Sequence, residues 1–122
     1  MLLGGILLSA TAVAGLFLRY QLRLTNDAAN SARALFAADG ELEWLAYCVT
    51  TEKNTIESAP NANQAEANLN CPSVTPEPTF TNATASYEIN ITFNADNTKD
   101  VRISAEGFSG KAVRGVETIF SF

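Results

Sequence analysis

The first eighteen residues contain no charged side chain, whereas the chain from Arg19 on mixes apolar, polar and charged positions. A helix over Met1–Leu18 would be about 27 Å long, close to the roughly 30 Å of hydrocarbon in a bilayer. The helical pattern continues past this segment, and no Lys or Arg precedes it as in a secretory signal peptide. We therefore expect a membrane segment that the working protein keeps, in a mature chain whose leader has been removed.

Beyond this segment, apolar side chains recur every three, four or seven residues, which is the pattern of one helical face. The helix is expected to be apolar all round in residues 1–24 (the stem) and amphipathic over residues 25–51. The predicted apolar face comprises Leu24, Ala28, Ala32, Leu35, Leu42, Leu45 and Val49. A helix of about fifty residues would be about 75 Å long, more than a small globule can bury, so other molecules must cover part of it.

Residues 52–86 are rich in Asn, Thr, Ala and Ser, contain all four prolines, and are expected to form a long loop. A loop of this length needs a tie, and the two cysteines, Cys48 and Cys71, can supply it. A disulfide over such a loop would stabilise the fold by about 3 to 4 kcal/mol. Two free thiols are the alternative, but an even cysteine count in a small anchored or exported chain favours the disulfide.

Residues 87–122 are predicted to form an antiparallel meander, because apolar and polar positions alternate with a period of two. The first strand carries Tyr87, Ile89, Ile91 and Phe93 on one face, and the second carries Val101, Ile103 and Ala105. Turns are expected over residues 94–98 and 108–111. The alternation is imperfect over Val113–Phe122, which predicts a bulge or an irregularity at the end of the third strand. The fold class is therefore α+β, with the amphipathic helix packed on a sheet of three or slightly more strands in a head of residues 25–122.

Composition argues against several classes of function. The chain has 122 residues, enough for one small domain, and a net charge of -5, which disfavours direct nucleic-acid binding. It has no histidine, the commonest general base, and two cysteines alone cannot build a four-ligand zinc site. We therefore expect no enzyme and no cofactor.

Three local patterns invite a chemical interpretation. Asp39, Glu41 and Glu43 could be an acid–base or metal cluster, but successive helical positions fan around the axis, which favours a solvated face or a subunit contact. Trp44 and Tyr47 are expected in the core or an interface rather than in a ligand site. Asn82-Ala-Thr and Asn90-Ile-Thr match the acceptor pattern for N-linked sugar, although such triplets also arise by chance in an Asn- and Thr-rich chain.

The order of these parts resembles a type IV pilin. Residues Ala28–Glu43 read Ala-Ala-Asn-Ser-Ala-Arg-Ala-Leu-Phe-Ala-Ala-Asp-Gly-Glu-Leu-Glu, which is similar to the helix segment of the minor-pilin-like branch. The resemblance covers the whole chain in architecture and about the first fifty residues in sequence. It implies a subunit of a helical surface filament, with the N-terminal helices in the filament core and the sheets facing outward.

The resemblance also implies roles for particular residues. Met1 matches the position where pilins are processed and methylated, whereas Gly5 replaces the glutamate that pairs with a neighbour's amino terminus in most pilins. Register must then come from apolar packing and close approach at small residues. The expected filament-core residues are Met1, Leu2, Leu3, Gly4, Gly5, Ile6, Leu7, Leu8, Val13, Leu16 and Phe17.

The expected function is thus a self-polymerising subunit that waits in the cytoplasmic membrane, is assembled by a membrane machine and ends on the cell surface. Adhesion, motility and DNA uptake are all compatible with such a filament. The alternatives are a minor pilin or pseudopilin of a secretion or pilus machine, and a membrane-anchored extracytoplasmic binding domain that does not polymerise.

Overall fold

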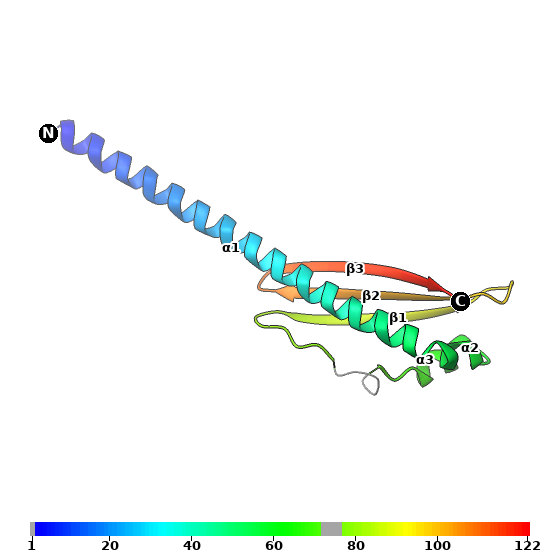
Figure 1. The fold of residues 1–122 in the computed structure, drawn as a ribbon. Helices are drawn as coiled ribbons and strands as arrows, with labels where there is room; N and C mark the ends of the chain where they lie inside the picture. Colours follow the sequence, from blue (N-terminus) through cyan, green and yellow to red (C-terminus); the bar gives the residue numbers. More distant parts are fainter. Residues whose placement is uncertain (1, 72–76) are drawn as a thin grey trace.

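The computed structural model describes residues 2–71 and 77–122, with side chains from Thr11 on, and has a long N-terminal helix packed on an antiparallel sheet. Figure 1 shows that the first half of the helix projects away from every other element, while its second half lies along one face of the sheet. This confirms the predicted α+β arrangement. The elements are α1 (Leu2–Thr51), α2 (Lys53–Ser58), α3 (Ala62–Asn68), β1 (Thr84–Phe93), β2 (Lys99–Ser109) and β3 (Ala112–Ser121).

The sheet is a meander with the strand order β1-β2-β3, so β2 is central. β3 pairs with β2 residue for residue, from Ser109 opposite Ala112 to Asp100 opposite Ser121. The predicted bulge in the third strand is therefore wrong. The imperfect alternation has another cause, because Val113 and Ile119 lie about half exposed on the face that points away from α1.

The core lies between α1 and the inner face of the sheet. At the end of the head nearest the stem, α1 meets β2 through small side chains, because a Cβ on Gly107 would overlap the carbonyl oxygen of Ala34 and lie 2.8 Å from the amide nitrogen of Ala38. Larger side chains fill the opposite end of the head. The buried apolar residues there include Leu45, Val49, Ile56, Ile91, Val101 and Ile103.

The predicted apolar face of the helix is correct only at its end. Leu45 and Val49 are buried and Leu42 is partly buried, but Leu24, Ala28, Ala32 and Leu35 are exposed. The face that meets the sheet instead carries Ala34, Ala37 and Ala38. A count of large apolar side chains misses this face, because close contact with a strand at a glycine requires alanine.

Residues 52–86, expected to be a loop, include two short helices and the first residues of β1. The side chain of Asn61 accepts a hydrogen bond from the Gln64 amide at 2.9 Å and caps α3. Lys99 donates from Nζ to the carbonyl oxygen of Ile56 at 3.1 Å, which places a positive charge at the C-terminal end of α2. Residues 72–76 of the predicted loop lie outside the described residues.

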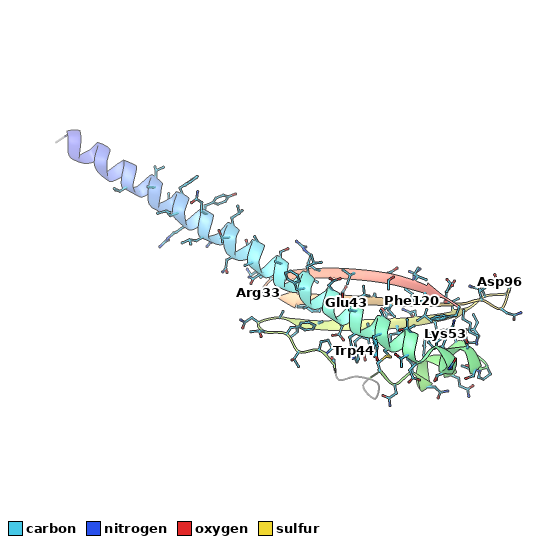
Figure 2. The ribbon with its side chains drawn as sticks, in the orientation of Figure 1. Arg33, Glu43, Trp44, Lys53, Asp96 and Phe120 are labelled. Carbon is cyan, nitrogen blue, oxygen red and sulfur yellow. A yellow bond between two sulfur atoms is a disulfide. The ribbon has the colours of Figure 1, made fainter. Side chains whose placement is uncertain are left out.

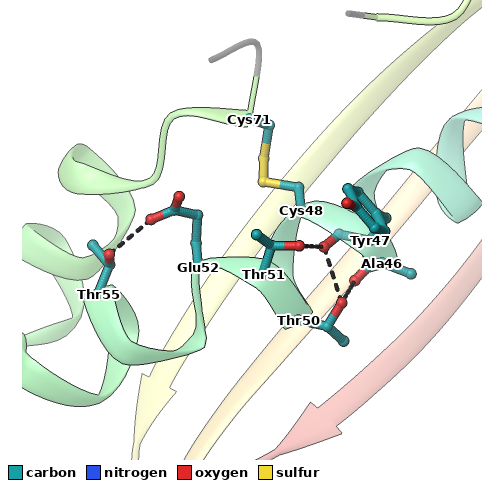
Figure 3. The surroundings of a disulfide bond; sticks show 8 residues. All are labelled: Ala46, Tyr47, Cys48, Thr50, Thr51, Glu52, Thr55 and Cys71. Atoms are coloured by element: carbon teal, nitrogen blue, oxygen red, sulfur yellow. Dashed lines mark hydrogen bonds between the residues drawn. A yellow bond between two sulfur atoms is a disulfide. The ribbon is translucent and has the colours of Figure 1, made fainter. Parts of the chain in front are cut away.

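The predicted disulfide between Cys48 and Cys71 is confirmed, with a Cα–Cα distance of 5.3 Å. It joins the last turn of α1 to the residues just after α3 (Figure 3). Thr51 donates its hydroxyl hydrogen to the Tyr47 carbonyl oxygen at 2.8 Å in the same turn, so a carbonyl at the end of α1 is satisfied. The disulfide therefore fixes α3 beside the end of the long helix.

One edge of the sheet is protected by this arrangement. Glu66 of α3 accepts a hydrogen bond from the amide of Ile91, on the outer edge of β1, at 2.8 Å. An unpaired strand edge is a template for unwanted pairing with another chain. The segment between α1 and the sheet thus covers part of the β1 edge as well as extending the core.

Candidate interaction surface

The most unusual surface of the molecule is the free half of α1. Every residue from Thr11 to Ala28 is exposed, and Figure 2 shows the described side chains of this segment projecting into open space with no other element beside them. Its large apolar side chains are each 59% to 69% exposed. They are Val13, Leu16, Phe17, Leu18, Tyr20, Leu22 and Leu24. A patch this large and apolar marks a contact surface.

Three of the predicted filament-core residues, Val13, Leu16 and Phe17, lie on this surface. The others are Met1 to Leu8, whose side chains lie outside the described residues, as does the processing site at Met1; the backbone of α1 is helical from Leu2. Gly15 has no atom within 4 Å of the position that a Cβ would occupy, so it leaves a shallow gap on the helix surface. Such a gap allows a second helix to approach closely.

The predicted membrane segment Met1–Leu18 falls largely outside the described side chains. Over the part of the chain that the structure does describe, α1 contains no eighteen-residue window with the hydropathy and low charge of a bilayer span.

Within the head, α1 also presents an exposed face opposite the sheet. Phe36 is 74% exposed and Tyr47 is 58% exposed, and the charged side chains of Asp39 and Glu43 lie exposed on the same part of the helix. Nothing else in the described part of the head covers these residues. The exposed surface of α1 therefore continues from the stem along the outer side of the head.

Asp39, Glu41 and Glu43 do not form a cluster, and the expected solvated face is correct for two of the three. Asp39 and Glu43 are exposed, whereas Glu41 is 1% exposed and its Oε1 has no hydrogen-bond partner among the described residues. Desolvation by burial, and then the negative charge of Glu77, raise the pKa of Glu41 above the ordinary value of a glutamate. The burial of this carboxyl group was not expected, because the charged residues Asp39 and Glu43 lie close by in sequence. The residues one turn away on its own side of the helix, including Ala37 and Leu45, are nevertheless buried.

The aromatic residues of this region have different surroundings. Trp44 is buried and its ring packs edge to face against Tyr87 of β1, with 5.7 Å between the ring centroids. Tyr47 instead remains on the surface, so of the two residues expected in the core or an interface, only Trp44 belongs to the core of a single chain.

A polar network that sequence reasoning missed lies at the turn between β1 and β2. The side-chain amide of Asn94 donates to Asp100 at 2.8 Å, and Ser121 donates to the other oxygen of Asp100 at 2.6 Å. The hydrogen bonds from Ser121 and then Asn94 lower the pKa of Asp100, and those from Thr98 lower the pKa of Asp96. These bonds join the turn to the end of β3, so we assign the network a structural role.

Both candidate glycosylation sites are accessible. Asn82 is exposed in a left-handed backbone conformation with φ of 59°, and its carbonyl oxygen accepts a hydrogen bond from Ser109 at 3.0 Å. Asn90 is exposed on the outer face of the sheet, where its amide donates to Glu88 at 3.1 Å. Attachment of sugar at either site stays a prediction.

Comparison with known proteins gives no match to any family model, any curated protein or any solved structure.

Proposed function

We propose that this chain is a structural subunit of an extracellular filament of the type IV pilus kind, which polymerises through the N-terminal half of α1. The observation that carries the proposal is that Thr11 to Ala28 stand clear of the head, with large apolar side chains exposed on several sides of the helix. One face of a helix can be covered by its own domain, but apolar side chains that point in several directions need neighbours outside that domain.

Other copies of the same chain can bury the exposed apolar side chains of such a helix. Parallel stems from several copies would bury one another's apolar side chains, at about 25 cal/mol for each Å² removed from water. Gly15 and the small residues near the start of the chain favour close packing between such helices. The sheets would then face outward, because they occupy only one side and one end of α1 (Figure 1).

Before assembly the stem needs a different cover, and we propose that this is the cytoplasmic membrane. Moving a stem from lipid into a filament exchanges one apolar environment for another, so little hydrophobic free energy is gained in the transfer. Assembly then requires packing between helices together with a membrane machine that consumes energy. The partners we propose are further copies of this chain, the lipid bilayer and that machine.

A filament of this kind is compatible with adhesion, motility or DNA uptake. The acidic net charge of -5 disfavours direct capture of DNA by the head. A minor pilin or pseudopilin would use the same stem in fewer copies, and a non-polymerising anchored domain would use it only to hold the head at the membrane.

The proposal is tested by shearing surface material from cells that produce the full chain, and examining it by electron microscopy and N-terminal mass spectrometry. We expect helical filaments built mainly from this chain, with a methylated Met1. A chain found only in the membrane fraction, as single copies, would contradict the proposal and support the anchored-domain alternative.

A matched pair of variants distinguishes the stem from other exposed apolar positions. Leu16→Asp changes an exposed side chain of the stem, and Val113→Asp changes one on the outer face of the sheet. We expect the first variant to abolish filaments and the second to leave them intact, with equal amounts of both chains in the cell. Filaments of normal yield from the Leu16→Asp chain would show that the stem is not the polymerising surface.

A further inference from the structure

Two pairs of like charges on the exposed surface of α1 are separated by the same interval. Arg19 and Arg23 are four residues apart in the stem, and Asp39 and Glu43 are four residues apart in the head. All four side chains are exposed, and none of them belongs to an ion pair within the described residues. Like charges four residues apart on a helix repel each other, so each pair by itself destabilises α1.

The two pairs are also related by a fixed displacement. Asp39 lies twenty positions after Arg19, and Glu43 lies twenty positions after Arg23. Twenty residues of helix span about 30 Å, so a parallel neighbour shifted by this distance places each acidic residue level with one arginine. Leu16 and Phe36, both exposed and apolar, have the same separation and would also meet.

The directions of the side chains agree with such a contact. At about 100° per residue, twenty residues turn the helix by about 200° beyond whole turns, so the two pairs lie on nearly opposite sides of α1. Asp39 and Glu43 lie exposed on the side of α1 opposite the sheet. Arg19 and Arg23 lie five whole turns before the buried residues Ala37 and Glu41, so they point to the side that the sheet occupies further along the helix. Two copies in the same orientation can then face each other through different surfaces, as in an open helical polymer.

We propose that neighbouring copies pack their α1 helices in parallel with an axial stagger of about 30 Å, so that Arg19 and Arg23 of one copy pair with Asp39 and Glu43 of the next. Helices packed 8–10 Å apart bring arginine and carboxylate side chains within ion-pairing reach. This inference rests on the proposed function and adds the element that sets the register. It assigns that role to charges in the middle of α1, in a chain that has Gly5 at its start.

Charge complementarity favours a second copy as the occupant of this surface. Phosphate groups of a lipid surface could pair with Arg19 and Arg23, but they would leave Asp39 and Glu43 without a partner. Another copy of this helix offers both charges at the matching interval. The two sources are distinguished by whether reversal of the acidic pair impairs polymerisation as much as reversal of the basic pair.

The test is a charge reversal in the full-length chain, read out as the amount of filament sheared from cells. We expect Arg19→Glu with Arg23→Glu to reduce filaments at least tenfold, and Asp39→Arg with Glu43→Arg to do the same. The chain carrying all four substitutions should recover filaments to within a few-fold of the unmodified chain. The amount of each chain in the membrane fraction controls for folding and stability.

The outcomes separate the two proposals. Normal filaments from either reversed pair, or no recovery with all four substitutions, would overturn the stagger while leaving the filament itself in place. Loss with the basic reversal alone, at normal yield of the acidic reversal, would favour contact with anionic lipid and also overturn it. Absence of filaments from the unmodified chain would instead overturn the proposed function.

Cross-linking provides a second measurement that does not depend on filament yield. In a chain with Arg19→Cys and Asp39→Cys, oxidation of filaments should link successive copies into a ladder of multimers. Arg19→Cys with Thr50→Cys is the matched control, because Thr50 is also exposed on the side of α1 opposite Arg19 but lies thirty-one positions away. A ladder of equal strength in both chains would contradict a defined stagger.

Discussion

At the scale of single residues, the contact between α1 and the sheet depends on Gly107. A Cβ at this position would overlap the Ala34 carbonyl oxygen. The backbones of α1 and β2 therefore lie closer together here than a side chain on β2 would allow. The helix cannot move away without losing the contacts of the larger core residues further along. The glycine is thus required by the packing distance rather than by its own backbone conformation.

We therefore expect Gly107→Ala to destabilise the head by about 3 kcal/mol, the upper end of the usual range for overpacking. Gly115→Ala is the control, because the nearest atom to its Cβ would be a flexible Glu106 side chain at 3.8 Å, and its stability should change by less than about 0.5 kcal/mol. The measurement is urea unfolding of the detergent-solubilised chain, followed by the fluorescence of Trp44. Equal stability of the two variants would show that α1 can shift on the sheet.

Glu41 is the second residue whose surroundings decide its behaviour. Because burial and Glu77 raise its pKa, the folded state holds the proton of this carboxyl more tightly than the unfolded state does. The free energy of unfolding should then decrease as the pH rises from the ordinary range of a glutamate through the raised pKa. Above that range the unpaired charge destabilises the fold.

Glu41→Gln should consequently raise the stability of the head at neutral pH by about 1 kcal/mol, and should abolish this part of its decrease with pH. Glu43→Gln removes a carboxylate two positions away, on the exposed side of the helix, and should leave the pH dependence unchanged. Unfolding curves between acidic and neutral pH provide the measurement. A Glu41→Gln chain that is less stable than the unmodified one at neutral pH would point to a cationic partner for this carboxylate.

At the scale of elements, the short helices α2 and α3 link the end of α1 to the sheet. Each helix contributes one buried side chain to the core, Ile56 from α2 and Ala65 from α3. Lys99 at the start of β2 donates to the last carbonyls of α2, and its Nζ also lies 4.4 Å from the centroid of the Phe93 ring. Neither helix is long enough to be stable alone, so tertiary contacts and the disulfide must hold them.

Replacing the disulfide by Cys48→Ala with Cys71→Ala should reduce the free energy of unfolding by about 3 kcal/mol, because the unfolded chain gains the freedom of a long loop. Hydrogen exchange should accelerate first in α2, α3 and the amide of Ile91, which Glu66 covers. Adding a reducing agent should destabilise the unmodified chain by a similar amount and have no effect on the double variant. A uniform increase of exchange over the whole head would mean that the disulfide does not act locally.

At the scale of the whole molecule, the stem and the head differ in what they need from their surroundings. The head has its own core, closed by the sheet, the second half of α1 and the short helices. The stem contributes no described residue to that core, since Thr11 to Ala28 are all exposed. Removal of the stem should therefore affect association and not folding.

A chain lacking residues 1–24 should be a soluble monomer whose unfolding temperature does not depend on protein concentration, and it should be absent from filaments when produced beside the full chain. Analytical ultracentrifugation and calorimetry provide the measurements. Full-length chain in detergent is the reference and should unfold with the same midpoint in denaturant. Incorporation of the shortened chain into filaments would mean that heads alone can assemble.

The sequence by itself determined the elements that local periodicity and covalent chemistry specify. An uninterrupted helical pattern predicted α1, alternation with a period of two predicted the strands, and turn residues predicted the break at residues 94–98. The disulfide followed from the cysteine count and the loop between Cys48 and Cys71. The helix, strands and turn depend on residues close in sequence, and two cysteines allow only one intramolecular disulfide. These features therefore require no knowledge of how the elements pack.

Only the tertiary structure decided which surfaces these elements use. Ala34, Ala37 and Ala38 form the buried face because Gly107 lies opposite them, and that pairing joins residues about seventy positions apart. The same contact turns Leu35 outward, and the folding of the head over α1 encloses Glu41. The helices α2 and α3, in the segment 52–86 that was expected to be a loop, also depend on residues distant in sequence, such as Lys99. The free energy of burial depends on what lies across the core, and a local pattern does not contain that information.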